Sequence, residues 1–373
     1  MKIKNIPLVL LLILSSPVLG STYVYKGHIA NKEITLYSDS NFINAFWVDK
    51  DDHKQIQHPL SSDCKFISSC DNVSKQTDLT LYDDTDIYID NNTNQIKFKD
   101  SISYFKFNHI WAEQNKALKI FNQNLMGYWF DGKKNQQYTV TLQKQFEISN
   151  KKEDEFNHLE LLQSDSSDKA YFTAVLSKKK QEKIRLVGIN VYAKNNHQLL
   201  QKIRNLNYSY NYFNSIELKD INFDGQLDLA IKKYPSQSRL GDNEDYYINV
   251  NGKFVATNLW GSNIYFNSKD STATGQKDCY DYNEKQQKIL TTIQSIYHYK
   301  KHQYIHIKNS CLLKNIDTNQ DRQCNDNEYN NCLLKRNNIH FDNPHYIDED
   351  NILYKNMVWY KGKIIDGYVY DDD

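Results

Sequence analysis

Glycine and proline are scarce in this sequence, with 12 Gly and 5 Pro among 373 residues. That scarcity excludes collagen-like chains and Pro/Gly-rich low-complexity chains. An excess of charge of one sign is also missing, because 46 Lys and Arg balance 46 Asp and Glu. Surfaces that bind nucleic acid or anionic lipid normally carry a basic excess. We therefore expect neither nucleic acid nor an anionic membrane as a partner.

Long hydrophobic runs are missing after the first twenty residues, so the sequence predicts no membrane span, which needs about 20 apolar residues. Residues 1–20 are different. Lys2 and Lys4 precede an apolar run from Ile6 to Leu14, and small residues follow up to Gly20. This is the pattern of a cleavable signal peptide. It predicts a periplasmic or secreted protein.

Familiar catalytic motifs are absent as well. The sequence has no G-x-S-x-G elbow, no H-E-x-x-H pair and no glycine-rich phosphate loop. We therefore expect a binding protein and not an enzyme. A secreted hydrolase remains an alternative, because paired catalytic carboxylates carry no sequence signature. A calcium-stiffened surface-binding module is a third interpretation.

Six cysteines, all outside the expected signal peptide, predict three disulfides, because an even count is typical of exported proteins. No C-x-x-C pair supports the rival interpretation as a zinc site. Six cysteines allow fifteen pairings. Short spacing along the chain favours three of them: Cys64–Cys70, Cys279–Cys311 and Cys324–Cys332.

Tyrosine is abundant, with 28 residues, and short alternating runs of apolar and polar residues recur along the chain. Both features favour strands. Asn251-Gly252 between two such runs is the strongest short signal for a hairpin. Helices are expected only at residues 110–118 and 153–162. The sequence therefore predicts an all-β fold.

Two segments about 80 residues apart, 45–49 and 127–131, read small–aromatic–Trp–apolar–Asp, a spacing near two propeller blades of roughly 40 residues each. We therefore predict a β-propeller-like meander of hairpins, with a β-sandwich as the alternative. Four regions are expected: the signal peptide at 1–20, an N-terminal β region at 21–165, a second β region at 166–313, and a polar extension at 314–373 with a final strand pair.

The most informative segment is the loop from residue 220 to residue 228. Oxygen ligands recur at every second position, with a glycine where the loop must turn, and hard cations such as calcium prefer oxygen ligands. Gly225 is the expected turn residue. The predicted calcium ligands are Asp220, Asn222, Asp224, Asp228 and the backbone carbonyl of Gln226.

This loop is not a complete EF-hand, because Ile231 occupies the position of the bidentate Glu. The residues that follow alternate like a strand. A further ligand is expected from the acidic turn at 241–245.

A second acidic segment has EF-hand spacing, with Asp317, Asn319, Asp321, Gln323, Asn325 and Glu328 as possible ligands. Arg322 stands at the position that normally requires glycine. An acidic surface loop stapled by a disulfide is the equal alternative.

Three histidines, His298, His302 and His306, could in principle bind zinc. A hairpin with a basic tip at residues 300–301 would place them on two strands, and is the favoured interpretation.

Residues 185–313 resemble a family of exported bacterial proteins that carry an N-F-D-G-x-x-D-L calcium loop. The matching residues are Leu199-Leu200-Gln201, Asn222-Phe223-Asp224-Gly225, Asp228-Leu229, Gly241-Asp242-Asn243 and Tyr246-Tyr247. The resemblance implies a propeller-fold, calcium-binding periplasmic immunity protein that inhibits a peptidoglycan hydrolase. Tyr234 and Arg239, in the turn after the loop, are the expected partner contacts, because aromatic and Arg side chains often anchor interfaces.

Overall fold

A computed structural model of the chain describes the following residues: 21–39, 42–50, 56–62, 78–90, 95–108, 111–114, 117–120, 124–210, 213–233, 243–259, 263–283, 285–334, 357–360 and 363–366. The expected signal peptide, Cys64, Cys70, Tyr234 and Arg239 lie outside these residues. The prediction of an all-β fold is confirmed. Strands dominate the described residues, with one short 3-10 turn, η3 (Asp84–Asp86), and one α-helix.

Eight antiparallel strands of the N-terminal part close into a barrel in the order β1-β12-β11-β8-β5-β4-β3-β2. Their bounds are β1 (Thr22–Ile29), β2 (Lys32–Asp39), β3 (Asn44–Asp49), β4 (Gln57–Ser62), β5 (Leu79–Asp83), β8 (Tyr104–Phe107), β11 (Asn124–Asp131) and β12 (Gln136–Ile148). Two hairpins are inserted between barrel strands: β6 (Ile87–Ile89) with β7 (Ile96–Phe98), and β9 (Trp111–Gln114) with β10 (Ala117–Ile120). The barrel closes where Thr22 pairs with Ile148.

The barrel interior is filled by large apolar side chains, and the two tryptophans of the repeated motif are among them. Trp47 on β3 and Trp129 on β11 belong to the same core cluster. Their rings meet edge to face, with centroids 5.9 Å apart, and Phe105 packs against both. Segments 45–49 and 127–131 are therefore two strands of one barrel and not corresponding strands of two blades.

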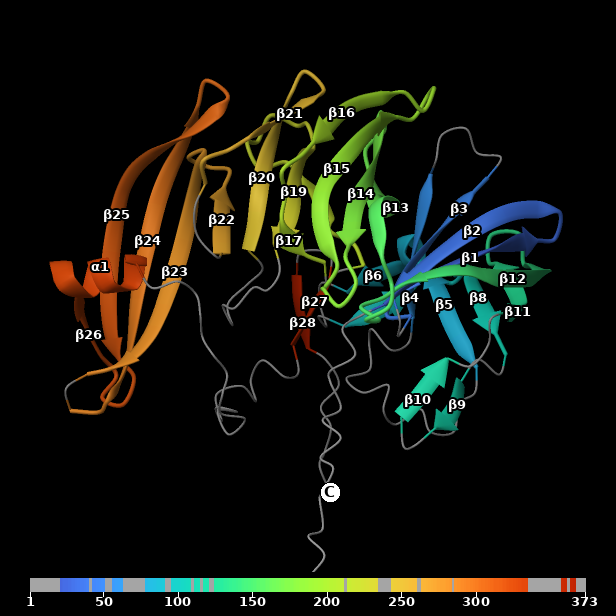
Figure 1. Cartoon of the computed structure of the whole chain (residues 1–373), viewed down its shortest axis with the longest axis horizontal. Helices are drawn as coiled ribbons and strands as arrows, with labels where there is room; N and C mark the ends of the chain where they lie inside the picture. Colours follow the sequence, from blue (N-terminus) through green and yellow to red (C-terminus); the bar gives the residue numbers. More distant parts are fainter. Residues whose placement is uncertain are drawn as a thin grey trace, which may run out of the picture.

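Three further antiparallel sheets follow the barrel in chain order (Figure 1). The first contains β13 (Phe156–Ser166), β14 (Ala170–Lys178), β15 (Arg185–Ala193), β16 (Leu199–Ile203) and β17 (Tyr208–Ser209). The second contains β18 (Ile216–Lys219), β19 (Asp228–Lys233), β20 (Asn243–Val250) and β21 (Lys253–Ala256). The third contains β22 (Asn263–Asn267), β23 (Thr272–Tyr282), β24 (Lys288–Lys300), β25 (Gln303–Asn315) and β26 (Gln320–Gln323).

Each of these sheets includes a four-stranded meander, which is also the strand order of a propeller blade. The closed N-terminal barrel does not follow that pattern, so the structure does not specifically support a propeller. The two expected helices are wrong. Residues 111–114 and 117–120 pair as strands β9 and β10, and most of residues 153–162 lie in β13. The boundary placed at residue 165 lies inside the β13–β14 hairpin, whereas the barrel ends with β12.

Continuous packing joins the barrel to the first two sheets. Val24 and Ile148 on the barrel share a core cluster with Phe172, Leu229 and Phe254 of those sheets. A separate cluster joins the second sheet to the third and includes residues from the loop at 220–228 and from the β24–β25 hairpin. The loop therefore sits where two sheets meet.

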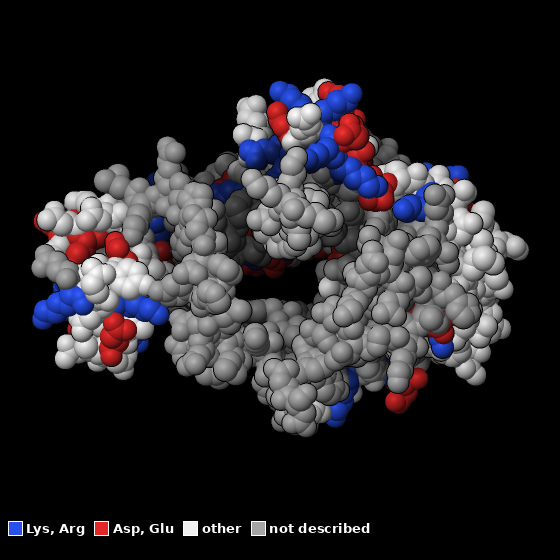
Figure 2. Space-filling view, turned by 60° about the horizontal axis from the view of Figure 1, so that its bottom comes forward, with Lys and Arg blue, Asp and Glu red and all other residues white. Residues whose placement is uncertain are grey.

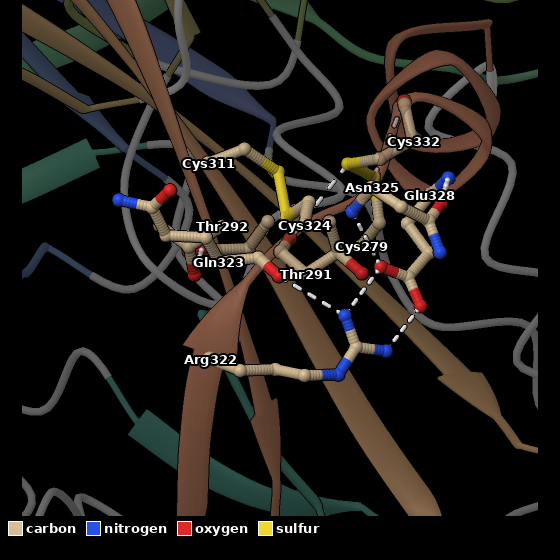
Figure 3. The surroundings of a disulfide bond; sticks show 11 residues. Cys279, Thr291, Thr292, Cys311, Arg322, Gln323, Cys324, Asn325, Glu328 and Cys332 are labelled. Carbon is tan, nitrogen blue, oxygen red and sulfur yellow. Dashed lines mark hydrogen bonds and ion pairs between the residues drawn. A yellow bond between two sulfur atoms is a disulfide. The ribbon is translucent and has the colours of Figure 1, made fainter.

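The C-terminal helix α1 (Asp326–Leu334) is bonded to the third sheet through Cys332, and a second disulfide joins Cys324, just before the helix, to Cys311 on β25. Two of the three pairings expected from spacing are wrong: the bonds in the described residues are Cys279–Cys332 and Cys311–Cys324. Cys279 and Ile293 of the sheet pack with Cys332 of the helix, so the fold brings together residues that are distant in sequence. Figure 3 shows the second bond beside the start of the helix. A final strand pair, β27 (Met357–Tyr360) with β28 (Lys363–Asp366), agrees with the expectation.

Candidate cation site in the loop between β18 and β19

The loop from residue 220 to residue 227 joins two paired strands, as the alternation after Asp228 predicted. Ile221 and Leu229 are fully buried and anchor the loop to the core. Phe223 is only half-buried and Leu227 is exposed, so two of the four apolar residues in this segment provide the anchoring. The loop is thus fixed at both ends and exposed in its middle.

Side-chain oxygens fold the loop upon itself. Asp220 accepts hydrogen bonds from the backbone N–H groups of Asp224 (3.2 Å) and Gly225 (2.9 Å). Asp224 in turn accepts one from the N–H of Gln226 at 2.8 Å. Gly225 has a φ of +80°, as expected for the sharp turn, and Phe223 also lies in the left-handed region at +64°. These bonds hold Asp220 and Asp224 on the same side of the chain.

Asp228 is the buried carboxylate of the site, with none of its surface exposed. One oxygen accepts the N–H of Ile221 (3.0 Å) and the other accepts the N–H of Asn249 (2.7 Å). Burial raises the pKa of Asp228 to about 6. The two N–H bonds oppose that shift, and the carboxylates of Asp224 and Asp220 add to it. The environment therefore disfavours the charged form unless a cation is present.

The three carboxylates lack a cationic partner in the part of the chain that the structure describes. Within the described residues, no Lys or Arg forms an ion pair with Asp220, Asp224 or Asp228. An ionised carboxylate removed from water needs compensation from a cation or a metal ion. Carboxylate and amide oxygens are the donors that calcium prefers. The donor types therefore fit a calcium ion.

The side chains of the loop are not arranged around a single point where an ion could bind. In the described part of the chain, no three His, Cys, Asp or Glu side chains are placed to hold a metal ion. The amide nitrogen of Asn222 points at Asp224 Oδ2 (3.1 Å), while its oxygen accepts the backbone N–H of Asp224. Calcium binding would require these side chains to rearrange, because the amide nitrogen of Asn222, and not its oxygen, faces Asp224 Oδ2.

Three residues that sequence reasoning missed complete the surroundings of the loop. Asn249 holds Asp228 through its N–H, and its amide group donates to the carbonyl of Leu227 at 3.2 Å. Tyr299 OH accepts a bond from the amide of Asn222 at 3.0 Å, and Tyr304 OH donates to the carbonyl of Ile221. Asn249 precedes the Asn-Gly turn and could have been suspected. No local signal marks the two tyrosines, which are 77 and 83 residues from the loop residues that they contact.

The acidic turn at 241–245 does not supply the missing ligand with its two described carboxylates. Glu244 forms an ion pair with Lys219 at 2.9 Å, and Asp245 forms one with Lys233 at 2.6 Å. Asp245 lies opposite Ile231, three residues along β19 from Asp228. Both carboxylates are therefore already neutralised by lysines.

The second acidic segment adopts a different structure from a metal loop. Gln320–Gln323 form strand β26, and Asp317 accepts the backbone N–H of Lys288 at 2.8 Å. Glu328 and Asn325 form a reciprocal cap at the start of α1, each accepting the other's N–H at 2.9 Å.

Arg322 binds both carboxylate oxygens of Glu328 (Figure 3) and lowers the pKa of that carboxyl. The residues with ligand spacing in this segment thus form a strand and a helix cap. Glu328, the last expected ligand, is bound by Arg322 instead. This outcome corresponds to the disulfide-stapled surface segment.

The three histidines lie on a hairpin, as the favoured interpretation held. His298 pairs with Ile305, whereas His306 pairs with Tyr297, so these two histidines occupy opposite faces of the sheet. His302 lies in the turn between the strands. Such an arrangement cannot surround one zinc ion.

No model of a known protein family matches the chain, and no curated protein does either. Among the described residues, no helix has the length and apolarity to cross a bilayer. Basic and acidic side chains are intermixed over the coloured part of the surface in Figure 2, in keeping with the balanced composition. The function has to be argued from the site itself.

Proposed function

We propose that this chain is a calcium-binding protein of the periplasm that inhibits a peptidoglycan hydrolase by binding to it. The observation that carries the calcium part is the buried Asp228 beside Asp220 and Asp224, with no cation from the described chain to balance them. A divalent ion at this place would offset their mutual repulsion and the desolvation of Asp228.

The inhibitor part of the proposal is supported by the rigid attachment of the loop to the β sheets. The loop at 220–228 is backed by two sheets; it accepts hydrogen bonds from Asn249 on β20 and Tyr304 on β25 and donates one to Tyr299 on β24. Loops fixed on a rigid β scaffold lose little conformational entropy on binding, which favours tight association with another protein. Two disulfides in the third sheet suit an oxidising compartment such as the periplasm.

Calcium binding is tested by isothermal titration of the purified, chelator-treated protein with calcium. One ion per chain should bind, and Asp224→Ala should remove that binding. Asp321→Ala is the matched control, because Asp321 lies in the second acidic segment on β26. Equal calcium binding by wild type and Asp224→Ala would place the ion elsewhere.

Inhibition is tested with purified peptidoglycan hydrolases, beginning with any that is encoded beside the gene for this chain. The purified chain should leave a peptidoglycan suspension intact. At near-equimolar amounts it should stop the loss of turbidity that the hydrolase causes. Cleavage of peptidoglycan by the chain alone would reverse the proposal and favour the secreted-hydrolase alternative.

A further inference from the structure

The hairpin between β24 and β25 ends in a turn with two unusual residues. Lys300 pairs with Gln303, so Lys301 and His302 form the two-residue connection. Both have positive φ, +52° and +62°. A two-residue connection with positive φ at both positions normally uses Asn-Gly, because other side chains are strained there.

The chain contains the relaxed form of the same turn elsewhere. Asn251 and Gly252 connect β20 to β21 with φ values of +54° and +84°. The β24–β25 turn keeps Lys301 and His302 although Asn-Gly would adopt the same backbone with less strain. Strain of this kind points to a role of the Lys and His side chains outside folding.

The tip presents unpaired positive charge. Lys300, Lys301 and His302 are exposed. In the described residues, no carboxylate forms an ion pair with either lysine of the tip. Cations held on a narrow projection without internal partners are available to a negatively charged surface.

The base of the hairpin is rigid. Tyr304 is buried and donates its hydroxyl proton to the carbonyl of Ile221, and Tyr299 bonds with Asn222 at 3.0 Å. Both tyrosines also pack in the cluster that joins the second and third sheets. The two residues that flank the basic tip are thus fixed to the loop at 220–228, and the tip is held in place before any partner arrives.

Exposed apolar side chains follow the tip along β25. Ile305 is 42% exposed and Ile307 is 56% exposed, both on β25. An apolar patch next to a charged tip is the composition of a protein–protein contact, with a dehydrated centre and a polar rim.

We propose that the β24–β25 tip is the surface by which this chain enters the cleft of a glycan-cleaving hydrolase, with Lys300 and Lys301 facing the catalytic carboxylates. This inference rests on the proposed function and narrows the partner to one class. Enzymes that cleave glycosidic bonds mostly carry two carboxylates in an open cleft. A narrow, preorganised, doubly charged hairpin matches such a cleft in shape and charge.

The experiment tests four forms of the full-length protein against the peptidoglycan hydrolases of the inhibition test, using loss of peptidoglycan turbidity as the readout. The forms are wild type, Lys300→Glu with Lys301→Glu, Lys301→Asn with His302→Gly, and the control Lys253→Glu. Lys253 is exposed and adjoins the relaxed Asn-Gly turn. The concentration that halves hydrolysis and the melting temperature are measured for each form.

Charge reversal should raise the half-inhibitory concentration by at least about tenfold, because it replaces attraction to the catalytic carboxylates with repulsion between like charges. The control should leave it unchanged. The Asn-Gly tip should weaken inhibition while the melting temperature stays equal or rises, because it relieves backbone strain. A purely structural role for the tip would not separate stability from inhibition in this way.

Other results would overturn the inference and locate the failure. If wild type inhibits and both tip variants inhibit equally well, the tip is not the contact, while the proposed function stands. If analysis of the products shows that the inhibited hydrolase cuts stem peptides and not glycan, the partner class is wrong. If wild type does not inhibit at all, the proposed function and this inference fail together.

Discussion

Removing the two disulfides separately should affect stability to different extents. Cys279–Cys332 joins residues separated by 53 positions, and Cys311–Cys324 joins residues separated by 13. Chain-entropy models relate stabilisation to the length of the closed loop and give about 4 kcal/mol for the first bond and about 3 kcal/mol for the second. Cys279→Ala with Cys332→Ala should therefore destabilise the third sheet more than Cys311→Ala with Cys324→Ala.

A third double variant distinguishes the observed disulfide connectivity from the one that the sequence spacing suggests, in which Cys279 pairs with Cys311. Cys279→Ala with Cys311→Ala removes one partner from each bond, so about 7 kcal/mol should be lost in the same models. Two free thiols, at Cys324 and Cys332, should then react with a thiol reagent. The other two double variants should add no reactive thiol.

The assay is urea unfolding of each variant, followed by far-ultraviolet circular dichroism, together with thiol counting under denaturing conditions. If Cys279→Ala with Cys311→Ala adds no free thiol and is the mildest of the three variants, those two cysteines are partners. The connectivity described here would then be wrong.

Further perturbations test the site and the scaffold. A chelator should lower the melting temperature of wild type but not of Asp224→Ala, because an ion at a hundred times its Kd adds about 2.7 kcal/mol; equal shifts in both would refute the site. Burial alone would raise the pKa of Glu160, but hydrogen bonds from Thr173, Asn190 and Tyr192 outweigh it and lower the pKa. Stability from this group is therefore present above the unfolded-state value and is lost as pH falls through the lowered one. Glu160→Gln should destabilise at pH 7 and much less at pH 3, and a difference that does not change between these pH values would contradict the assignment. Gly127→Ala should destabilise by about 1–3 kcal/mol, because its Cβ would lie 1.9 Å from the Lys106 carbonyl oxygen; an unchanged melting curve would show that β11 and β8 separate easily.

Local features were predictable from the sequence because local chemistry determines them. Asn251-Gly252 requires a hairpin wherever alternating strands flank it, and the structure has that hairpin. Gly225 marks the sharp turn of the loop, and its φ is positive as expected. Both inferences depend on conformational preferences within a few residues.

The predicted helix at 153–162 failed for a physical reason. In β13 the adjacent residues Leu161 and Leu162 are both buried, each in a different cluster. A strand covered on both faces has no clean two-residue alternation, and its apolar residues then resemble a helical pattern. Burial of both faces is a property of the assembled sheets.

Long-range pairings could not be predicted for a different reason. The Cys279–Cys332 bond, the tyrosines beside the loop and the closure of the barrel all join residues that are far apart in the chain. Cys332 meets Cys279 only because α1 lies across the third sheet. Spacing along the sequence contains no information about such a contact.

Closure of the barrel between β1 and β12 also constrains how the chain folds. The β1–β2 hairpin can form as soon as it is synthesised, since Ile29 and Lys32 pair across a short turn. The other edge of β1 can pair only after β12, which ends at Ile148, has been synthesised. Bringing together the ends of so long a chain segment is slow. Until β12 arrives, β1 has an unpaired edge that can associate with another chain. Variants that weaken β12 should therefore accumulate as aggregates during synthesis, even where the finished barrel is nearly as stable as wild type.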